Sequence, residues 1–441
     1  MNRLPALLLL GLAACATNDE WRYQRVVWEN HPLIRRTEDI APSVQPLHAK
    51  ASLTVDDCWR LALVQSEALA LTGEELVRLQ TLYEQAVSAQ LPRVSFKGSW
   101  VRNEASSDAQ HAEYKLAAKQ PIFAGLRDYY ALRQTNASYE AKEEDLRQAR
   151  LLIFADVAGA FYAVLQSARE LETMNASLKL AEERLEELVE RQKAGMSRRS
   201  EVLAQDAVVS AVQARVEQLK GAQAVAWDVL RFVTGVSGTP TLVDTITEPG
   251  DLPDVARILE DAIGRRHDLK SLRAEVTAAI EGRGVARAGY LPTATVEGNY
   301  YTHREDNAIN WDVTLSIEIP IIDSGSTQAK LREANSLIRS ANLRLTQLQR
   351  AILLEVRRSY TDVKALQAQL VSLEKALASA EENHQIVQAE YRQQIATNVE
   401  VLASFSTLQQ ARLDRDRARF ALKLAGVRLS VESGALPGSA K

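Results

Sequence analysis

Pro121–Gly125 reads Pro-Ile-Phe-Ala-Gly, and a second joint, Pro320–Gly325, reads Pro-Ile-Ile-Asp-Ser-Gly. Before each of these joints, an alternating apolar and polar run begins at a Leu-Pro pair, Leu91–Pro92 and Leu291–Pro292. After each joint, a very long helical pattern begins. A search for internal repeats comes first in interpreting a sequence, because a repeat determines the architecture of the whole chain. We therefore interpret the chain as a tandem duplication of one unit, which consists of a short helix, a β-hairpin, a very long helix and a shorter returning helix.

The composition of the chain is that of long helices. Glycine (19) and proline (12) are scarce among 441 residues, and no Gly/Ser-rich linker divides the chain. The formal charge of −4, from 53 basic and 57 acidic side chains, indicates no nucleic-acid partner. No apolar stretch reaches the length expected of a membrane-spanning helix. A membrane β-barrel stays open, because its strands carry only an alternating pattern.

The two predicted hairpins, 93–121 and 293–319, alternate in the way that membrane strands do. In the second hairpin Val313, Leu315 and Ile317 alternate with Thr314 and Ser316. This pattern suits lipid on one face and water on the other, although a half-buried sheet of a soluble protein alternates in the same way. Four strands cannot close a barrel alone, and open edges do not occur in lipid. In a membrane, these strands would need strands from neighbouring subunits.

The long helices are predicted from about Arg127 to Lys193 and from about Thr327 to Gln394, because no proline interrupts either stretch. Their apolar residues recur with heptad spacing, which indicates packing against partner helices rather than around a globular core. His384 falls on the second seam where the first copy has Leu185. We interpret it as a tolerated seam residue rather than a metal ligand or pH sensor.

The predicted organisation follows these signals. One helix is predicted from Val55, behind the candidate cap Thr54, to about Gln90. The first repeat covers 53–235, a Thr-, Gly- and Pro-rich connector covers 236–253, the second repeat covers 254–434, and a tail covers 435–441. Cys58 lies in an apolar helical pattern and is expected to be a buried small hydrophobe.

The amino terminus resembles that of a bacterial lipoprotein. Residues 1–14 form a short signal peptide that ends in small residues before Cys15, and 15–52 reads as an extended segment. Cys15 is therefore the predicted lipidation (palmitate) site. The alternative is an ordinary signal peptide with an incidental cysteine.

A family resemblance covers roughly Leu53 to Gly434. It rests on the two joints, on Arg266–Leu269 (Arg-His-Asp-Leu), and on the motifs Glu201–Leu203 and Glu400–Leu402. In order and in double occurrence these resemble the TolC family of outer-membrane factors, in its lipoprotein branch.

The resemblance implies a fold and a function. The fold is mainly α with a membrane β-barrel: three subunits with four strands each would form a trimeric 12-stranded barrel continuous with a periplasmic α-helical tube. The implied function is a passive exit duct in the Gram-negative outer membrane, coupled through a periplasmic adaptor to an inner-membrane transporter. The implied partners are the homotrimer, the adaptor, the transporter and outer-membrane lipid.

The resemblance also implies two sets of site residues. The periplasmic aperture would be formed at the start of the last helix by Glu400, Leu402, Ser404 and Phe405. Adaptor docking would use the helical tips, at Gly195, Met196, Ser197, Arg198, Ile395, Ala396 and Thr397. Glu400 and Ser404 are one helical turn apart, so we expect them on one face of a helix.

No catalytic function, cofactor or metal is predicted. The six histidines are scattered, and no nucleophile elbow, phosphate-binding loop or dinucleotide motif occurs. Two other classes stay open: a periplasmic coiled-coil adaptor or structural lipoprotein, with one helical hairpin in a β-rich fold, and a filament-like scaffold, which would not need the alternating strands.

Overall fold

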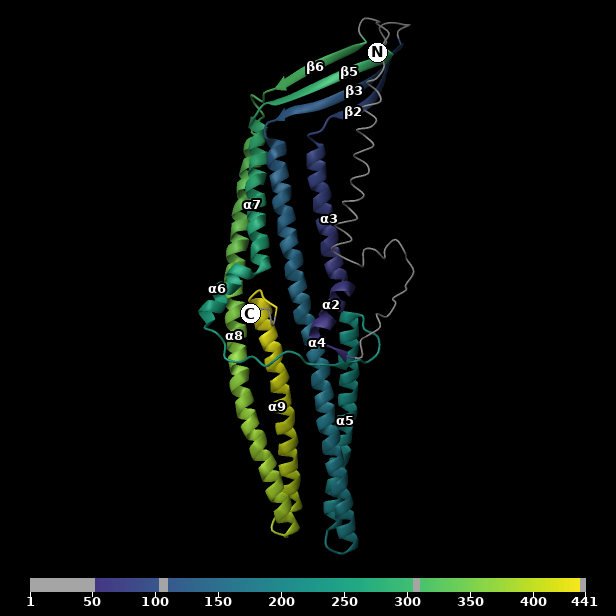
Figure 1. Cartoon of the computed structure of the whole chain (residues 1–441), viewed down its shortest axis with the longest axis vertical. Coiled ribbons are helices and arrows are strands. Elements are labelled where there is room, and N and C mark those ends of the chain that lie inside the picture. The colour runs from purple at the N-terminus through teal and green to yellow at the C-terminus, as the bar shows by residue number, and fades with distance from the viewer. Residues whose placement is uncertain (1–51, 103–109, 304–309, 437–441) are drawn as a thin grey trace. The chain divides into compact units, whose positions relative to one another are not determined.

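The computed structural model describes residues 52–102, 110–303 and 310–436 (Figure 1). The predicted signal peptide and Cys15 lie outside the described residues. The chain divides into two compact units. The sheet-bearing unit contains 71–147 and 267–349, and the helical unit contains the described residues up to 70, 148–266 and 350 onwards. Each unit therefore takes segments from both copies of the repeat.

The sheet-bearing unit contains one antiparallel sheet in the order β2-β3-β5-β6. Its strands are β2 (Arg93–Arg102), β3 (Gln110–Ala124), β5 (Thr293–His303) and β6 (Trp311–Glu318). The two hairpins pair through β3 and β5, so β2 and β6 are the outer strands of this sheet. β3 continues past its predicted end at Pro121 to Ala124. A register shift between Pro121 and Phe123 lets the strand pass a residue that has no backbone N–H.

The sheet has one apolar and one polar face. Register places Phe96 opposite Leu116, Leu116 opposite Tyr300, and Tyr300 opposite Trp311. Cross-strand partners point to the same side of a sheet, so these residues share one face. The large apolar residues exposed on this face are Val94, Phe96, Trp100, Tyr114, Leu116, Tyr300, Trp311, Val313, Leu315 and Ile317. No layer of the described structure covers them.

The polar face carries paired charges. Lys97 lies 3.5 Å from Glu297, and Lys115 lies 3.1 Å from Glu113. Asp312 accepts hydrogen bonds from the Tyr301 hydroxyl at 2.7 Å and from the Asn299 amide at 2.9 Å. Cross-strand partners thus hold Lys97, Tyr301 and Asn299, whereas the partner of Lys115 lies on its own strand. The predicted alternation is confirmed.

Four helices lie wholly or partly in this unit: α3 (Glu67–Ser88), α4 (Arg127–Lys193), α7 (His267–Arg287) and α8 (Ser326–Arg392). Both α4 and α8 are 67 residues long, and this confirms the predicted long helices. Lys142 on α4 lies 2.9 Å from Glu75 on α3. The 3₁₀ turn Ala288–Tyr290 after α7 lies against Thr327 on α8.

Helix α7 approaches α4 very closely. A Cβ atom at Gly284 would lie 2.4 Å from the Tyr130 ring, so only glycine fits there. Arg133 on α4 lies 3.0 Å from Glu281 on α7. Glycine therefore sets the distance between these helices, and the ion pair fixes their register.

Each joint between sheet and long helix uses two consecutive left-handed residues. They are Gly125 (φ 63°) with Leu126 (φ 64°), and Ser324 (φ 56°) with Gly325 (φ 83°). In the repeat, Gly125 corresponds to Ser324, and Leu126 corresponds to Gly325. In each copy one position is glycine and the other carries a side chain in a conformation that L residues rarely adopt.

The helical unit adds α2 (Val55–Gln65), α5 (Arg199–Thr234), α6 (Val255–Arg265) and α9 (Asn398–Glu432). Short strands β1 (Ser52–Leu53) and β4 (Thr241–Leu242) pair in parallel. Thr54 caps α2 with a capping box, as predicted. The core gathers around Phe154, Phe161 and Leu230, with Val427 from the second copy. Across this core Glu170 accepts two hydrogen bonds from Arg417, at 2.8 and 2.9 Å.

Two further predictions from the sequence can be compared with the structure of these helices. Cys58 is completely buried, as predicted, and burial raises the pKa of its thiol to about 11. Helix α4, however, is long and apolar enough to pass as one candidate membrane span, against the expectation of none. Its apolar residues Phe154 and Phe161 lie in the core of the helical unit, which accounts for that composition without a membrane.

Candidate functional site

The predicted docking residues lie at two helical tips, where α4 turns into α5 and α8 turns into α9 (Figure 1). The backbone N–H of Met196 donates to Arg191 O at 2.8 Å, and that of Ile395 donates to Glu390 O at 2.9 Å. Both bonds close a helix end through a left-handed residue, Gly195 and Gln394 respectively. The two tips thus have the same backbone, although only the first has the glycine that this conformation favours.

The tips present different side chains. Met196 and Ile395 are both exposed, at 61% and 70%. Arg198 precedes α5 without making a side-chain cap, whereas its counterpart Thr397 caps α9. Gly195 is also exposed, Ser197 is half-buried and donates to Glu201 at 2.6 Å, and Ala396 packs against the small core around Tyr391. Among the predicted docking residues, those of the first tip therefore include one cation, Arg198, and those of the second tip include no charged side chain.

Glu400 is the exposed member of the predicted aperture set. Its carboxylate accepts hydrogen bonds from the Thr397 backbone N–H at 2.6 Å and from the Thr397 hydroxyl at 2.8 Å. These two bonds lower the pKa of Glu400, so it carries its charge at neutral pH.

The other three aperture residues lie inward. Leu402 is half-buried, Ser404 is buried at 4% exposure, and Phe405 is buried beside His384 of α8. Glu400 and Ser404 thus differ in exposure despite their helical spacing, because α8 covers one side of α9 at Ser404.

Ser404 belongs to a hydrogen-bond chain that runs from Gln388 through His384. The Gln388 amide contacts His384 Nε2 at 3.0 Å, His384 Nδ1 contacts the Ser404 hydroxyl at 2.9 Å, and that hydroxyl donates to Val401 O at 2.8 Å. Burial first, and then the positive charge of Arg412, lowers the pKa of His384. A neutral imidazole that donates from Nδ1 satisfies every contact, and this agrees with the interpretation of a seam residue.

A second buried contact near the tips was not predicted. Tyr391 on α8 is buried between two α4 side chains, with Arg184 at 4.1 Å and Arg191 at 5.1 Å from its ring centre. Its hydroxyl lies 3.4 Å from Glu201 on α5. The signal in the sequence is the heptad spacing of the two arginines, which places both on one helix face.

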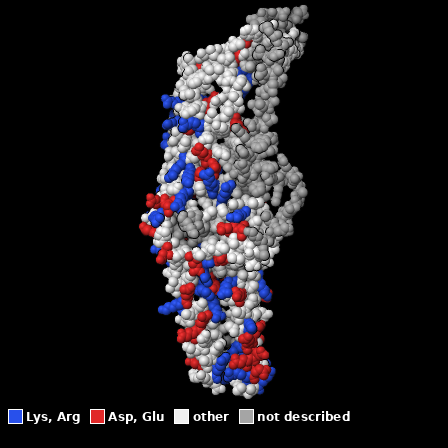
Figure 2. Space-filling model, in the orientation of Figure 1, with Lys and Arg blue, Asp and Glu red and all other residues white. Residues whose placement is uncertain are grey.

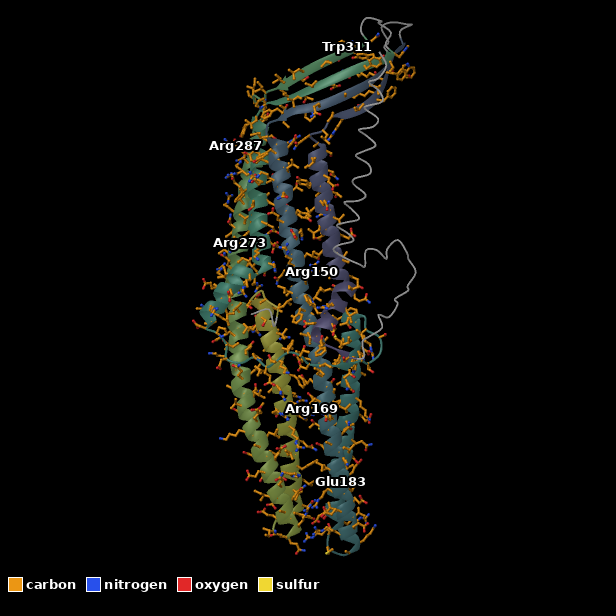
Figure 3. The ribbon with its side chains drawn as sticks, in the orientation of Figure 1. Arg150, Arg169, Glu183, Arg273, Arg287 and Trp311 are labelled. Atoms are coloured by element: carbon orange, nitrogen blue, oxygen red, sulfur yellow. The ribbon has the colours of Figure 1, made fainter. Side chains whose placement is uncertain are left out.

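The side-chain view shows where several residues lie along the strands and helices (Figure 3). Trp311 begins β6 at the end of that strand away from the joint, and Arg273 and Arg287 lie along α7. Glu183 lies near the end of α4 that leads to the first tip. In the described part of the chain, no group of three or more His, Cys, Asp or Glu is placed to hold a metal ion.

Comparisons with known proteins agree with this geometry. The family model described as "Outer membrane efflux protein" matches twice, over residues 59–236 and 258–435. The second match is offset from the first by the same amount at its start and at its end, as a tandem duplication requires.

Three relatives illustrate the likeness. Protein CyaE of Bordetella pertussis is 26% identical over 48% of this chain, and the chain spans 48% of that relative. Outer membrane protein TolC of Vibrio cholerae is 23% identical, with 69% of this chain and 71% of the relative covered. Cation efflux system protein CusC of Escherichia coli K12 is 24% identical, with 94% of this chain and 96% of the relative covered.

A crystal structure of CusC superposes with a TM-score of 0.77 at 20% identity, covering 86% of this chain and 92% of the other. The mainly helical fold predicted from the sequence is confirmed. The relatives are channels rather than enzymes, in agreement with the prediction of a non-catalytic function. The chain belongs to the outer membrane efflux protein family and is homologous to outer-membrane efflux channels.

Proposed function

We propose that the chain is the outer-membrane channel of a tripartite efflux or secretion system. In this proposal, it is a passive exit duct that a periplasmic adaptor couples to an inner-membrane pump. Three copies, each with a four-stranded sheet, assemble into one barrel of twelve strands in the outer membrane of a Gram-negative bacterium. The energy for transport comes from the pump.

The open sheet is the observation that carries this proposal. One face exposes a continuous apolar surface, and the outer strands β2 and β6 each have one edge without a partner strand in the described chain. An exposed apolar sheet with two open edges is costly in water. Sharing edges between copies and placing the apolar face in lipid removes both costs.

The two helical tips are the proposed adaptor sites. Each presents an exposed apolar residue, Met196 or Ile395, on a turn that its own hydrogen bonds hold. The charge difference between Arg198 and Thr397 makes the two sites unequal, so an adaptor hairpin distinguishes them.

Glu400 is the proposed selectivity residue of the periplasmic aperture. It is exposed, charged and fixed by Thr397 at the first turn of α9. In a trimer, three such carboxylates near the axis form an acidic ring that favours cations. Leu402 is the neighbouring apolar candidate for closing the pore.

A lipid on Cys15 is the proposed anchor. A single acyl chain gives only marginal binding, so the barrel dominates retention and the lipid assists it. Intact-mass analysis of the mature amino terminus measures this directly, and an unmodified Cys15 would end the proposal of a lipid anchor.

A pair of substitutions on β6 tests the channel. Leu315 lies on the apolar face, and Thr314, the next residue, lies on the polar face. On the lipid face of a barrel, lysine costs about 2–4 kcal/mol near the midplane. We expect Leu315→Lys to abolish trimers in outer-membrane fractions and conductance in planar bilayers, while Thr314→Lys keeps both. The proposal would be contradicted if the Leu315→Lys variant formed trimers and conducted as the wild type does. It would also be contradicted if the wild-type protein were soluble without detergent.

The alternative of a periplasmic adaptor or structural lipoprotein gains no support from the geometry. It requires a sheet that packs its apolar face within the chain, and a single helical hairpin. The described chain has two helical hairpins, α4–α5 and α8–α9, and a sheet with a bare apolar face.

A further inference from the structure

A cavity of about 200 Å³ lies in the helical unit near the two tips, where α4, α5, α8 and α9 meet. Leu180 and Val401 form part of its apolar wall, and Leu402 and Phe405 line it from the start of α9. Glu183, which is labelled in Figure 3, lines it from α4. Sites for organic ligands usually have volumes of about 300–1,000 Å³. The smaller volume of this cavity suits water or a small ion.

One wall of the cavity is the edge of the Arg184 guanidinium, whose side chain is 14% exposed. Its Nη1 donates to Glu187 at 2.5 Å, and its Cζ lies 4.1 Å from the centre of the Tyr391 ring. Among the described residues, the other two nitrogens, Nε and Nη2, are buried without a hydrogen-bond partner. These nitrogens are a parallel pair of donors, the arrangement with which arginine binds carboxylates and phosphates.

A buried acceptor, the Oε1 atom of Gln205, belongs to the same cavity. Gln205 is 2% exposed, and its Nε2 donates to Ala181 O at 2.9 Å. This bond identifies the two ends of the amide, because a backbone carbonyl oxygen can only accept. In the described part of the chain, no group donates to Gln205 Oε1. A molecule that satisfies this cavity therefore accepts from Arg184 and donates to Gln205.

His384 also lines the cavity, but it does not supply the missing donor. Its Nδ1 contacts the Ser404 hydroxyl at 2.9 Å, and its Nε2 contacts the Gln388 amide at 3.0 Å. Both nitrogens of the neutral ring are thus engaged within the hydrogen-bond chain. The donor for Gln205 has to come from a molecule inside the cavity.

The charges around the cavity allow an anion to bind. The lining carboxylates are Glu183, which lies 3.9 Å from Lys179, and Glu187, which engages Arg184 at Nη1 rather than at the open edge. Arg392 lines the cavity and forms no ion pair in the described chain. On the surface at this end of α4 and α8, Figure 2 shows acidic and basic side chains mixed together. Exposed cations there compete with carboxylates and water, so the buried Arg184 edge is the stronger anion site.

We propose that the cavity binds a small protonated oxyanion, such as hydrogen phosphate. Two of its oxygens accept from Nε and Nη2 of Arg184, and its O–H donates to Gln205 Oε1. Sulfate has the same shape but carries no proton at neutral pH, so it satisfies Arg184 and leaves Gln205 without a donor. The site is independent of the proposed transport function. Because only the folded packing of the four helices forms it, binding stabilises the folded chain.

Thermal unfolding of the detergent-solubilised protein tests the site, with inorganic phosphate or sulfate added at constant ionic strength in chloride. We expect phosphate to raise the unfolding midpoint until the effect saturates, with an apparent Kd about tenfold or more below that of sulfate. General salt stabilisation does not saturate in this way and affects both anions. Equal Kd values for the two anions would overturn the proposal. The absence of a saturable response to phosphate would also overturn it and assign the cavity to water.

Arg184→Lys tests the open edge of the guanidinium. Lysine keeps the charge but cannot present two fixed parallel donors, so the affinity for phosphate should fall about tenfold. Arg191→Lys is the matched control. Arg191 lies 3.6 Å from the same Glu187 and 5.1 Å from the centre of the same Tyr391 ring, but it does not line the cavity. The control should respond to phosphate as the wild type does, and an equal response from Arg184→Lys would contradict the site.

Gln205→Met tests the acceptor. Methionine has a similar length and fills the same space without a carbonyl oxygen. This variant should bind phosphate and sulfate with equal affinity, because the preference for phosphate comes from Gln205 Oε1. A variant that still prefers phosphate would overturn the assignment of the O–H to Gln205. If Gln205→Met does not fold, the comparison of the two anions on the wild type still decides, and its result does not depend on whether the chain conducts.

Discussion

Gln394 adopts the left-handed backbone of Gly195, its counterpart in the first copy of the repeat, with φ of 62° against 76°. The same hydrogen bond from the following residue closes both turns. A residue with a Cβ therefore occupies a conformation that favours glycine, and the turn keeps its shape at a cost in stability.

Gln394→Gly should raise the free energy of unfolding by about 1 kcal/mol, because it removes left-handed strain while every backbone hydrogen bond is kept. The reverse change, Gly195→Gln, should lower it by a similar amount. Thermal unfolding of the detergent-solubilised protein measures both. Equal midpoints for the wild type and both variants would show that the turn carries no strain.

Gly284→Ala should destabilise the sheet-bearing unit by about 1–3 kcal/mol, because the new methyl group overlaps the Tyr130 ring. Gly159→Ala is the control, since a Cβ there meets nothing within 4 Å. It should stabilise α4 by about 0.5–1 kcal/mol through helix propensity. Adding Tyr130→Ala should recover part of the loss caused by Gly284→Ala, and a fully additive double variant would argue against the close contact.

The Glu170–Arg417 pair should make stability depend on pH. Hydrogen bonds from Arg417 lower the pKa of Glu170 below its ordinary value of 4.5. A carboxyl with a lowered pKa contributes stability above the unfolded value, and this stability disappears as the pH falls through the folded value. Glu170→Gln should therefore lower the free energy of unfolding by about 1–3 kcal/mol at pH 7. Below pH 4.5 this loss should become progressively smaller.

The matched control for this pair is Glu172→Gln. Glu172 pairs with Arg169 at 2.7 Å, but its side chain is largely exposed. An exposed pair contributes about 0–1 kcal/mol, so this variant should differ little from wild type at either pH. A Glu170→Gln penalty that does not change between pH 7 and pH 3 would show that packing, not charge, holds the pair.

Glu400→Gln should lower the cation preference of the channel, and Glu400→Lys should reverse it, in single-channel recordings under a salt gradient. Glutamine at this position keeps the capping box with Thr397, so the first variant removes charge and preserves the helix start. The corresponding residue of the first copy, Glu201, provides the control Glu201→Gln. If the channel selects ions as the wild type does after both changes at Glu400, that residue is not at the aperture.

Arg198→Glu should reduce export while the trimer stays intact. In the described structure the Arg198 side chain makes no capping hydrogen bond and no ion pair, so its reversal breaks nothing inside the chain. Lys375→Glu, on an exposed part of α8 away from the tips, is the charge-matched control. Export assays with the cognate adaptor and pump measure the effect, and equal export by the two variants would count against docking at Arg198.

The regular elements of this fold were accessible from the sequence because each depends on local signals. The bounds predicted for the first long helix, Arg127 and Lys193, are those observed, since no proline interrupts it and a left-handed pair stops the preceding strand. Thr54 was identifiable as a cap from its side chain alone. The break at Ser66 was missed, because the apolar pattern continues across it into α3.

The contacts between elements were less accessible. His384 could be placed on a seam, but its bond to Ser404 depends on how α9 lies against α8. The burial of Ser404 follows from the same packing, which helical spacing does not reveal. The insertion of Tyr391 between Arg184 and Arg191 joins residues from the two copies of the repeat, and no local pattern specifies it.

The pairing of β3 with β5 has a consequence for biosynthesis. Gln120 pairs with Val296, which the ribosome adds only after it has made α4, α5, α6 and α7. Until then, β3 has only β2 beside it, and the apolar face of this first hairpin, with Phe96 and Leu116, stays bare. The nascent chain is most prone to aggregation in this interval, and a holdase chaperone that releases late in synthesis meets that need.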